Sequence, residues 1–276
     1  MVLSVQNNAA ALVALENLNK TNTLLAKTQG EISTGLAVAT AKDNASVWSI
    51  AQAQRADIGA LNSVKTSLNR AASISDVTSA AGGSISDLLV QLREKVVGAM
   101  DPSLSPSSRQ ALNADYQALL RQIAQMTNAA SFDGANLLNG SLSNDIQFLA
   151  NADGTAFITL SVKDMSLGGS IITLASTSTI GTVTAATSNL SLLDASLANV
   201  NQALGDLGSQ AKQIDAHNVF VTKLMDVLET GVGNLVDADM AKESARLQAL
   251  QVQQQLGIQS LSIANQAPQV ILSLFR

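Results

Sequence analysis

The side chains that could carry out chemistry are few and scattered along the chain. The only histidine, His217, lies within a helical pattern, where a structural or solvated role is far more common than catalysis. Asp237 and Asp239 could suggest a metal site, but two carboxylates alone are weak evidence, and capping of the next helix explains them equally well. Gly168-Gly169 has no P-loop lysine after it. The sequence therefore predicts no enzyme, no catalytic residue, no metal site and no cofactor.

Two single aromatic residues, Trp48 and Tyr116, could stack on a ligand. Single aromatics on apolar helix faces are more often packing residues, and we expect that role for both. The charged run Arg93-Glu94-Lys95 is most simply a solvated face or a contact between subunits.

The composition narrows the class of protein. The chain has 276 residues, a net charge of −5 and no cysteine, so disulfides and thiolate metal sites are excluded. A negative chain lacks the clustered basic residues that nucleic acid requires. Hydrophobic residues make up 46% of the chain but aromatics only 3%, which favours long, closely packed helices. The first residues lack a basic leader and a continuous apolar core, so we expect no Sec-type signal peptide.

The C-terminal segment has the most unusual pattern. No charged residue lies between Arg246 and Arg276, although the segment is rich in Leu, Gln and Ala. Its apolar and small residues form two helical stripes, and one partner helix cannot cover both. The first stripe contains Leu247, Leu250, Gly257, Leu261, Ala264, Ile271 and Phe275, and the second contains Val252, Leu256, Ile263, Val270 and Leu274.

Two simpler interpretations of this segment are a buried helix of a large monomer and a membrane span. A span needs roughly 20 mostly apolar residues, whereas Gln, Asn and Ser interrupt this segment every few positions. A helix buried by copies of the same chain fits better, because no charge must lose its water. We therefore predict a polymerisation surface and no membrane span.

The helical pattern continues through most of the chain. Helices are predicted over about 5–32, 45–100 and 107–128, with Asp101-Pro102 ending the second. From Leu190 to Val232 an unbroken alternation of three- and four-residue steps predicts a coiled-coil seam, in which Asn218 is the polar member that could fix the register. Gly231 and Gly233 are expected to break that helix.

The period changes between these helices. Ile146 and Phe148, and then Ile158, Leu160 and Val162, alternate with other residues around an Asn-Ala-Asp-Gly turn, which predicts a β-hairpin. The Ser/Thr-rich stretch that follows, to about residue 188, is predicted to be a short surface segment. The predicted fold is mainly α: a rod of long antiparallel coiled-coil helices with a small hairpin, whose N- and C-terminal helices pair.

The two ends and the approach to the hairpin resemble bacterial flagellin. The resemblance is carried by ISTGLAVATAKDNAS (32–46), FDGANLLNG (132–140) and NLVDADMAKESARLQALQVQQQLGIQSLSIANQAPQVILSLFR (234–276), and covers about 2–163 and 185–276. Residues 164–184 stand where flagellins usually carry variable outer domains. The chain is therefore similar to a short flagellin lacking those domains.

This resemblance implies five regions. They are a filament-core helix and linker (1–44), outer-tube helices with the hairpin (45–165), a surface segment (166–188), a returning outer-tube helix (189–233) and a C-terminal filament-core helix (234–276). It also implies a motility filament outside the bacterial cell, built after type III export. The implied partners are other flagellin subunits including paralogues, hook-associated junction and cap proteins, and the export apparatus.

The side chains expected at the polymerisation interface are large and apolar, and they come from both ends of the chain. They are Leu12, Leu15, Leu18, Leu25, Ile32, Leu247, Leu250, Leu256, Leu261, Ile263, Val270, Ile271, Leu274 and Phe275. Hydroxyls that are candidates for glycosylation are those of Ser176, Thr177, Ser178 and Thr179. Two alternatives to a filament subunit remain open: a flagellin-like surface adhesin that binds a polysaccharide, and a hook-filament junction protein.

Overall fold

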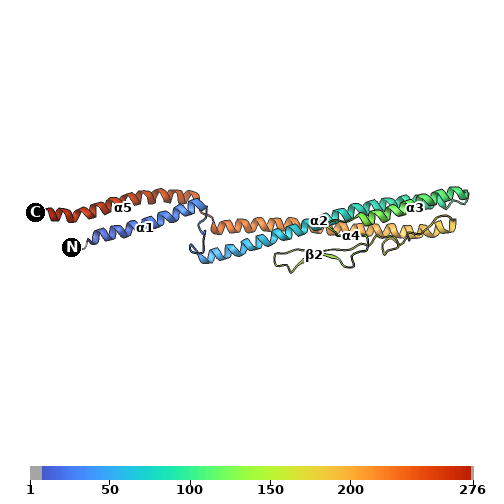
Figure 1. Ribbon diagram of the computed structural model, residues 1–276, viewed down its shortest axis with the longest axis horizontal. Helices are drawn as coiled ribbons and strands as arrows, with labels where there is room; N and C mark the ends of the chain where they lie inside the picture. Colours follow the sequence, from blue (N-terminus) through green and yellow to red (C-terminus); the bar gives the residue numbers. More distant parts are fainter. Residues whose placement is uncertain (1–7, 275–276) are drawn as a thin grey trace. The chain divides into compact units, whose positions relative to one another are not determined.

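The structure is a computed structural model that describes the backbone of residues 8–274 and the side chains of residues 8–266. Five helices and one hairpin follow each other along the chain: α1 (Ala9–Thr34), α2 (Ala45–Ala99), α3 (Pro106–Ala129), β1 (Ile146–Leu149), β2 (Phe157–Leu160), α4 (Val183–Val236) and α5 (Met240–Leu274) (Figure 1). The predicted mainly helical fold with a small hairpin is confirmed.

The chain divides into two compact units. The terminal unit contains residues 1–56 and 227–276, and the central unit contains residues 57–226. In the terminal unit α1 and α5 pack along each other, which confirms the predicted pairing of the two ends (Figure 1).

In the central unit α2 and α4 run antiparallel. Arg93 pairs with Asp194 at 2.7 Å, and at the other end Asn218 donates to the side-chain oxygen of Asn69 at 2.7 Å. The seam side chains at seven-residue intervals are fully buried: Leu193, Val200, Leu207, Ile214 and Val221. The heptad pattern and the position of Asn218 in the helix contact are therefore as predicted.

Helix α3 and the hairpin complete the central unit. Tyr116, Leu120 and Ile123 of α3 are buried in the same core as α2 and α4. The two strands pair antiparallel, with Phe148 opposite Ile158 and both side chains buried. His217 of α4 holds the hairpin through a 2.6 Å hydrogen bond between its Nε2 and the carbonyl oxygen of Ala150.

The Ser/Thr-rich segment after the hairpin is not only a surface segment, because part of it packs into the central core. Ile172, Leu174 and Ile180 are fully buried in the central core. Its backbone is also tied to helices on both sides: Ile180 N–H donates to Asn113 of α3 at 2.7 Å, and Thr173 N–H donates to Ser196 of α4 at 3.1 Å. Sequence reasoning missed this packing because the few large apolar residues that carry it, which include the half-buried Leu167 and Ile171, have no regular period.

The helix ends follow local capping chemistry. The carboxylate of Asp239 accepts from the N–H groups of Ala241 and Lys242 at 3.1 Å each, so Asp239 caps α5 as expected. Asp237 instead forms a backbone bridge with Leu36. The expectation that Gly231 and Gly233 break α4 is wrong, since the helix continues to Val236. Val232 and Val236 at this end of α4 are buried, and their packing outweighs the low helix propensity of glycine.

Candidate assembly interface

The candidate interface is the pair formed by α1 and α5. Asn8 Nδ2 donates to the carbonyl oxygen of Ala264 at 2.7 Å, and Gln254 Nε2 donates to Asn22 Oδ1 at 2.7 Å. The start of α1 therefore faces the later part of α5, and the two helices are antiparallel. Gly257 lets them approach closely, because a Cβ at that position would lie 3.2 Å from Leu18 Cδ1.

The α1–α5 contact buries little apolar surface. Leu25 and Leu250 are its buried large side chains among the residues whose side chains are described, together with the polar residues Thr21, Thr28 and Glu31. A fully buried Leu contributes about 1.5–3 kcal/mol. Fixing the backbone of each residue costs about 1–2 kcal/mol, so this pair is only weakly stabilised by its own contacts.

The structure separates the two apolar stripes of α5. Leu247, Leu250, Gly257, Leu261 and Ala264 of the first stripe are buried or half-buried against α1. The second stripe is exposed: Leu256 keeps 56% and Ile263 keeps 69% of its surface open to solvent, and Val252 is exposed as well. One stripe thus belongs to contacts within the chain, and the other is left uncovered.

The predicted interface residues of α1 divide in the same way. Leu25 is buried and Leu18 and Ile32 are half-buried against α5, whereas Leu12 and Leu15 are exposed. The side chains of Val270, Ile271 and Leu274, and the whole of Phe275, lie outside the described residues. Val13 and Ile258 are also exposed, and the prediction missed them. Ile258 directly follows Gly257 of the first stripe, and Val13 directly follows the predicted interface residue Leu12, which could have revealed both.

A groove runs between the two helices on the side of the uncovered stripe. It encloses about 840 Å³ and is lined mostly by small or apolar residues, including Ala10, Ala14, Gly257, Ser260 and Ala264, with Leu256 and Ile263 also contributing. The polar residues Asn17, Lys20 and Gln253 line it as well. The small residues leave room for side chains from another helix. The arrangement therefore offers both an apolar ridge and a hollow beside it.

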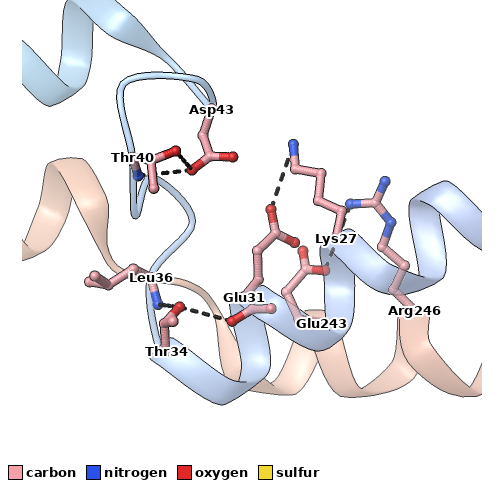
Figure 2. A network of polar contacts seen from close by, with 9 residues as sticks. Lys27, Glu31, Thr34, Leu36, Thr40, Asp43, Glu243 and Arg246 are labelled. Atoms are coloured by element: carbon pink, nitrogen blue, oxygen red, sulfur yellow. Dashed lines mark hydrogen bonds and ion pairs between the residues drawn. The ribbon is translucent and has the colours of Figure 1, made fainter.

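Charged residues gather where α1 ends and α5 begins (Figure 2). Lys27 lies 3.7 Å from Glu31 within α1, and Arg246 lies 3.7 Å from Glu243 within α5. Both carboxylates are largely buried, and both cations are about half exposed. The charge-free part of α5 thus begins directly after these ion pairs, whose cations keep about half of their surface in water.

Hydrogen bonds tie the linkers beside these ion pairs to the neighbouring chain segment. Ala37 N–H donates to Val236 O at 2.7 Å, and Ala238 N–H donates to Gly35 O at 2.8 Å, where Gly35 has the positive φ of a left-handed cap. Figure 2 shows the carboxylate of Asp43 accepting from the backbone and hydroxyl of Thr40 at 2.9 and 3.0 Å. These hydrogen bonds lower the pKa of Asp43 below its ordinary value.

The remaining candidate residues do not form a site together. His217 contacts the hairpin and the ring of Phe220, and Tyr116 is buried in the core, where burial raises the pKa of its phenol. Trp48 is half-buried near the start of α2. Within the described residues, no group of three or more His, Cys, Asp or Glu side chains could hold a metal ion.

The hydroxyls predicted as modification sites differ in exposure. Ser176, Thr177 and Thr179 are exposed, while Ser178 is half-buried, and its carbonyl accepts a hydrogen bond from Gln117. Over the part of the chain that the structure describes, no helix is both long and apolar enough to cross a membrane.

Comparisons with known proteins point to one family. The bacterial flagellin N-terminal helical region matches residues 5–143, and the bacterial flagellin C-terminal helical region matches residues 190–275. Flagellin FljJ of Caulobacter vibrioides is 55% identical over 100% of this chain and 99% of its own length. A flagellin of Brucella melitensis is 38% identical over 99% of both chains.

A solved structure supports the fold. A putative flagellar hook-associated protein from Vibrio parahaemolyticus superposes with a TM-score of 0.59 at 12% identity, covering 71% of this chain and 100% of that chain. This likeness concerns the fold alone. The full-length relatives are flagellins, and nothing in these comparisons favours the adhesin or junction alternatives. Together with the paired terminal helices and the charge-free α5, these matches show that the chain belongs to the bacterial flagellin family.

Proposed function

We propose that this chain, a filament subunit of the flagellin family, polymerises through the uncovered apolar surface of its α1–α5 pair. The observation that carries the proposal is the exposed second stripe of α5, above all Leu256 and Ile263, on a helix without charges after Arg246. Copies of the same chain can cover this stripe without desolvating any charge of α5 after Arg246. The groove beside it accepts side chains from a neighbouring helix.

The division of the two stripes gives each a separate role. The stripe around Leu250 and Leu261 holds α5 to α1 of the same chain, and the stripe around Leu256 and Ile263 contacts other copies. Leu12 and Leu15 of α1 extend the surface between copies. We assign Val270 and Leu274, which continue the second stripe, to the same assembly surface on sequence grounds. Ile271 and Phe275 belong to the first stripe and stay predicted interface residues.

The experiment that tests this proposal compares the full-length chain with a truncation that ends at Arg246. Both are incubated under filament-forming conditions and analysed by sedimentation and electron microscopy. The full chain is expected to form filaments, and the truncation should remain soluble while its central unit stays helical by circular dichroism. Filaments from the truncated chain would refute a role for α5 in assembly.

The finer assignments follow from family membership. The filament lies outside the cell, and its subunit passes through the flagellar export apparatus and meets cap and hook-associated junction proteins, with paralogous flagellins as further neighbours. Glycans would attach at Ser176, Thr177 or Thr179, whose exposure makes them better acceptors than Ser178. Intact-protein mass spectrometry of the protein from its native source tests this modification, and an unmodified mass would contradict it.

A further inference from the structure

The chain contains a single Asn-Gly dipeptide, Asn139-Gly140, in the loop between α3 and β1. An asparagine side chain can react with the backbone nitrogen of the residue that follows it. Glycine in that place leaves the nitrogen sterically open, because it has no Cβ. Gly140 is exposed and Asn139 is half-buried, so solvent reaches the segment that carries both reacting groups.

The side chain of Asn139 is held in an arrangement that favours this attack. Its Oδ1 accepts a hydrogen bond from the N–H of Ser141 at 3.0 Å and another from the hydroxyl of Ser141 at 2.6 Å. Both donors would stabilise the negative charge that forms on Oδ1 when a nucleophile attacks Cγ, because hydrogen bonds to a charged oxygen are stronger. Among the described residues, none accepts a hydrogen bond from Nδ2, the nitrogen that would leave as ammonia.

Two other asparagines of this region differ from Asn139 in these respects. Asn136 is buried, and its Nδ2 donates to two backbone carbonyl oxygens at 2.8 and 3.3 Å. Asn151 in the hairpin turn also accepts two N–H groups on its Oδ1, at 3.0 Å each, but its Nδ2 donates to Thr155 Oγ1 at 2.8 Å and Ala152 follows it. Asn139 therefore combines a polarised carbonyl, an amide nitrogen that is not held and a following glycine.

The fold also restricts position 140 to glycine. Gly140 has a φ of +66°, which residues with a side chain rarely adopt, and a Cβ there would lie 2.9 Å from Asp164 Oδ2. Two residues earlier, the carbonyl oxygen of Leu138 accepts from the N–H of Met165 at 2.8 Å. The Asn-Gly dipeptide is thus part of the contact between this loop and the segment after β2.

We propose that Asn139 is a site of spontaneous deamidation in the folded chain, and that Ser141 promotes the reaction. The nitrogen of Gly140 loses its proton to solvent and bonds to Cγ of Asn139. The Cγ–Nδ2 bond then breaks, and ammonia leaves after taking a proton from water, which gives a five-membered succinimide. Water opens this ring at either carbonyl, so an aspartate or an isoaspartate remains at position 139. The reaction consumes one water molecule and needs no oxidant or reductant.

The product changes the contact between Gly140 and Asp164. A carboxylate at position 139 brings a second negative charge near that of Asp164, and like charges at short range repel each other. An isoaspartate also adds one carbon to the main chain, close to the hydrogen bond between Leu138 and Met165. Both changes weaken the packing of the loop, and the modified fraction grows with the time since the chain folded.

Peptide mapping by mass spectrometry tests the proposal on the full-length folded chain, incubated at mildly alkaline pH and sampled over time. The peptide that contains Asn139 should gain the mass difference between an amide and an acid, and it should separate into aspartate and isoaspartate forms. The peptide that contains Asn151 is the internal control and should stay unmodified over the same period. An unmodified Asn139 would overturn the proposal, and so would equal rates at the two asparagines.

Replacing Ser141 with alanine tests the role of its hydroxyl. Loss of one of the two hydrogen bonds to Oδ1 should slow the reaction roughly fivefold in the folded chain. In urea neither hydrogen bond persists, so Ser141→Ala and the wild type should react alike. Ser143→Ala makes the same change at an exposed position two residues later and should react at the wild-type rate.

Two results of this comparison would contradict the role of the folded loop. Equal rates for folded Ser141→Ala and the folded wild type would mean that the hydroxyl does not promote the reaction. A wild-type chain that reacts faster in urea than in its folded state would mean that the fold protects Asn139.

Discussion

Replacing Ile263 with serine isolates the contribution of the uncovered stripe from that of the helix pair. Ile263 keeps 69% of its surface exposed in the free chain. Full burial of an isoleucine contributes about 1.5–3 kcal/mol, so covering the exposed part in a filament is worth about 1–2 kcal/mol per subunit. Since 1.4 kcal/mol is a factor of ten, Ile263→Ser should raise the critical concentration by roughly 5- to 30-fold.

The assay is sedimentation of polymer over a series of total protein concentrations, with circular dichroism of the free chain measured in parallel. Leu250→Ser is the contrasting variant, because Leu250 is only 6% exposed and its loss should destabilise the α1–α5 pair itself by about 2–5 kcal/mol. Gln255→Ser, at an exposed polar position of α5, is the control and should assemble as the wild type does. Wild-type assembly of Ile263→Ser would show that the exposed stripe stays in solvent in the filament, and would refute the reasoning.

Two further predictions concern packing and the linker. Gly82→Val should lower the free energy of unfolding by about 1–3 kcal/mol, because even a Cβ at Gly82 would lie 2.7 Å from Leu204 Cδ2. Thermal melting measures this loss. Gly83→Val is the control, since nothing lies within 4 Å of its Cβ position, and equal melting temperatures of the two variants would contradict the close contact at Gly82. Thr40→Val should raise the pKa of Asp43 toward its ordinary value in an NMR titration, and an unchanged pKa would contradict the assignment. Because the folded-state pKa is lowered, the stability from this carboxylate is present above the ordinary pKa and is lost as pH falls through the lowered value.

The sequence predicted the elements whose patterns repeat over many turns. The seven-residue spacing of Leu193, Val200 and Leu207 indicated a seam, and all three side chains are fully buried. The hairpin followed from alternation around an Asn-Ala-Asp-Gly turn. These features were predictable because local periodicity determines which face of an element is buried.

Other features depend on contacts that periodicity does not encode. Both stripes of α5 are apolar, so only the position of α1 shows that Leu250 is covered and Leu256 is not. The same limit applies to Ile172 and Ile180, whose burial depends on α3 and α4 rather than on any local pattern.

The segment between the hairpin and α4 determines where this protein could display a foreign peptide. Ile172, Leu174 and Ile180 are anchored in the core, but Ala175, Ser176 and Thr177 form an exposed turn between those anchors. A peptide inserted after Ser176 would lengthen an existing turn at a cost of only about 0.6 kcal/mol for each doubling of loop length. An insertion a few residues earlier would pull Ile172 and Leu174 out of the core. As a scaffold for repetitive antigen or enzyme display, the chain therefore offers a site only a few residues wide between two fixed anchors.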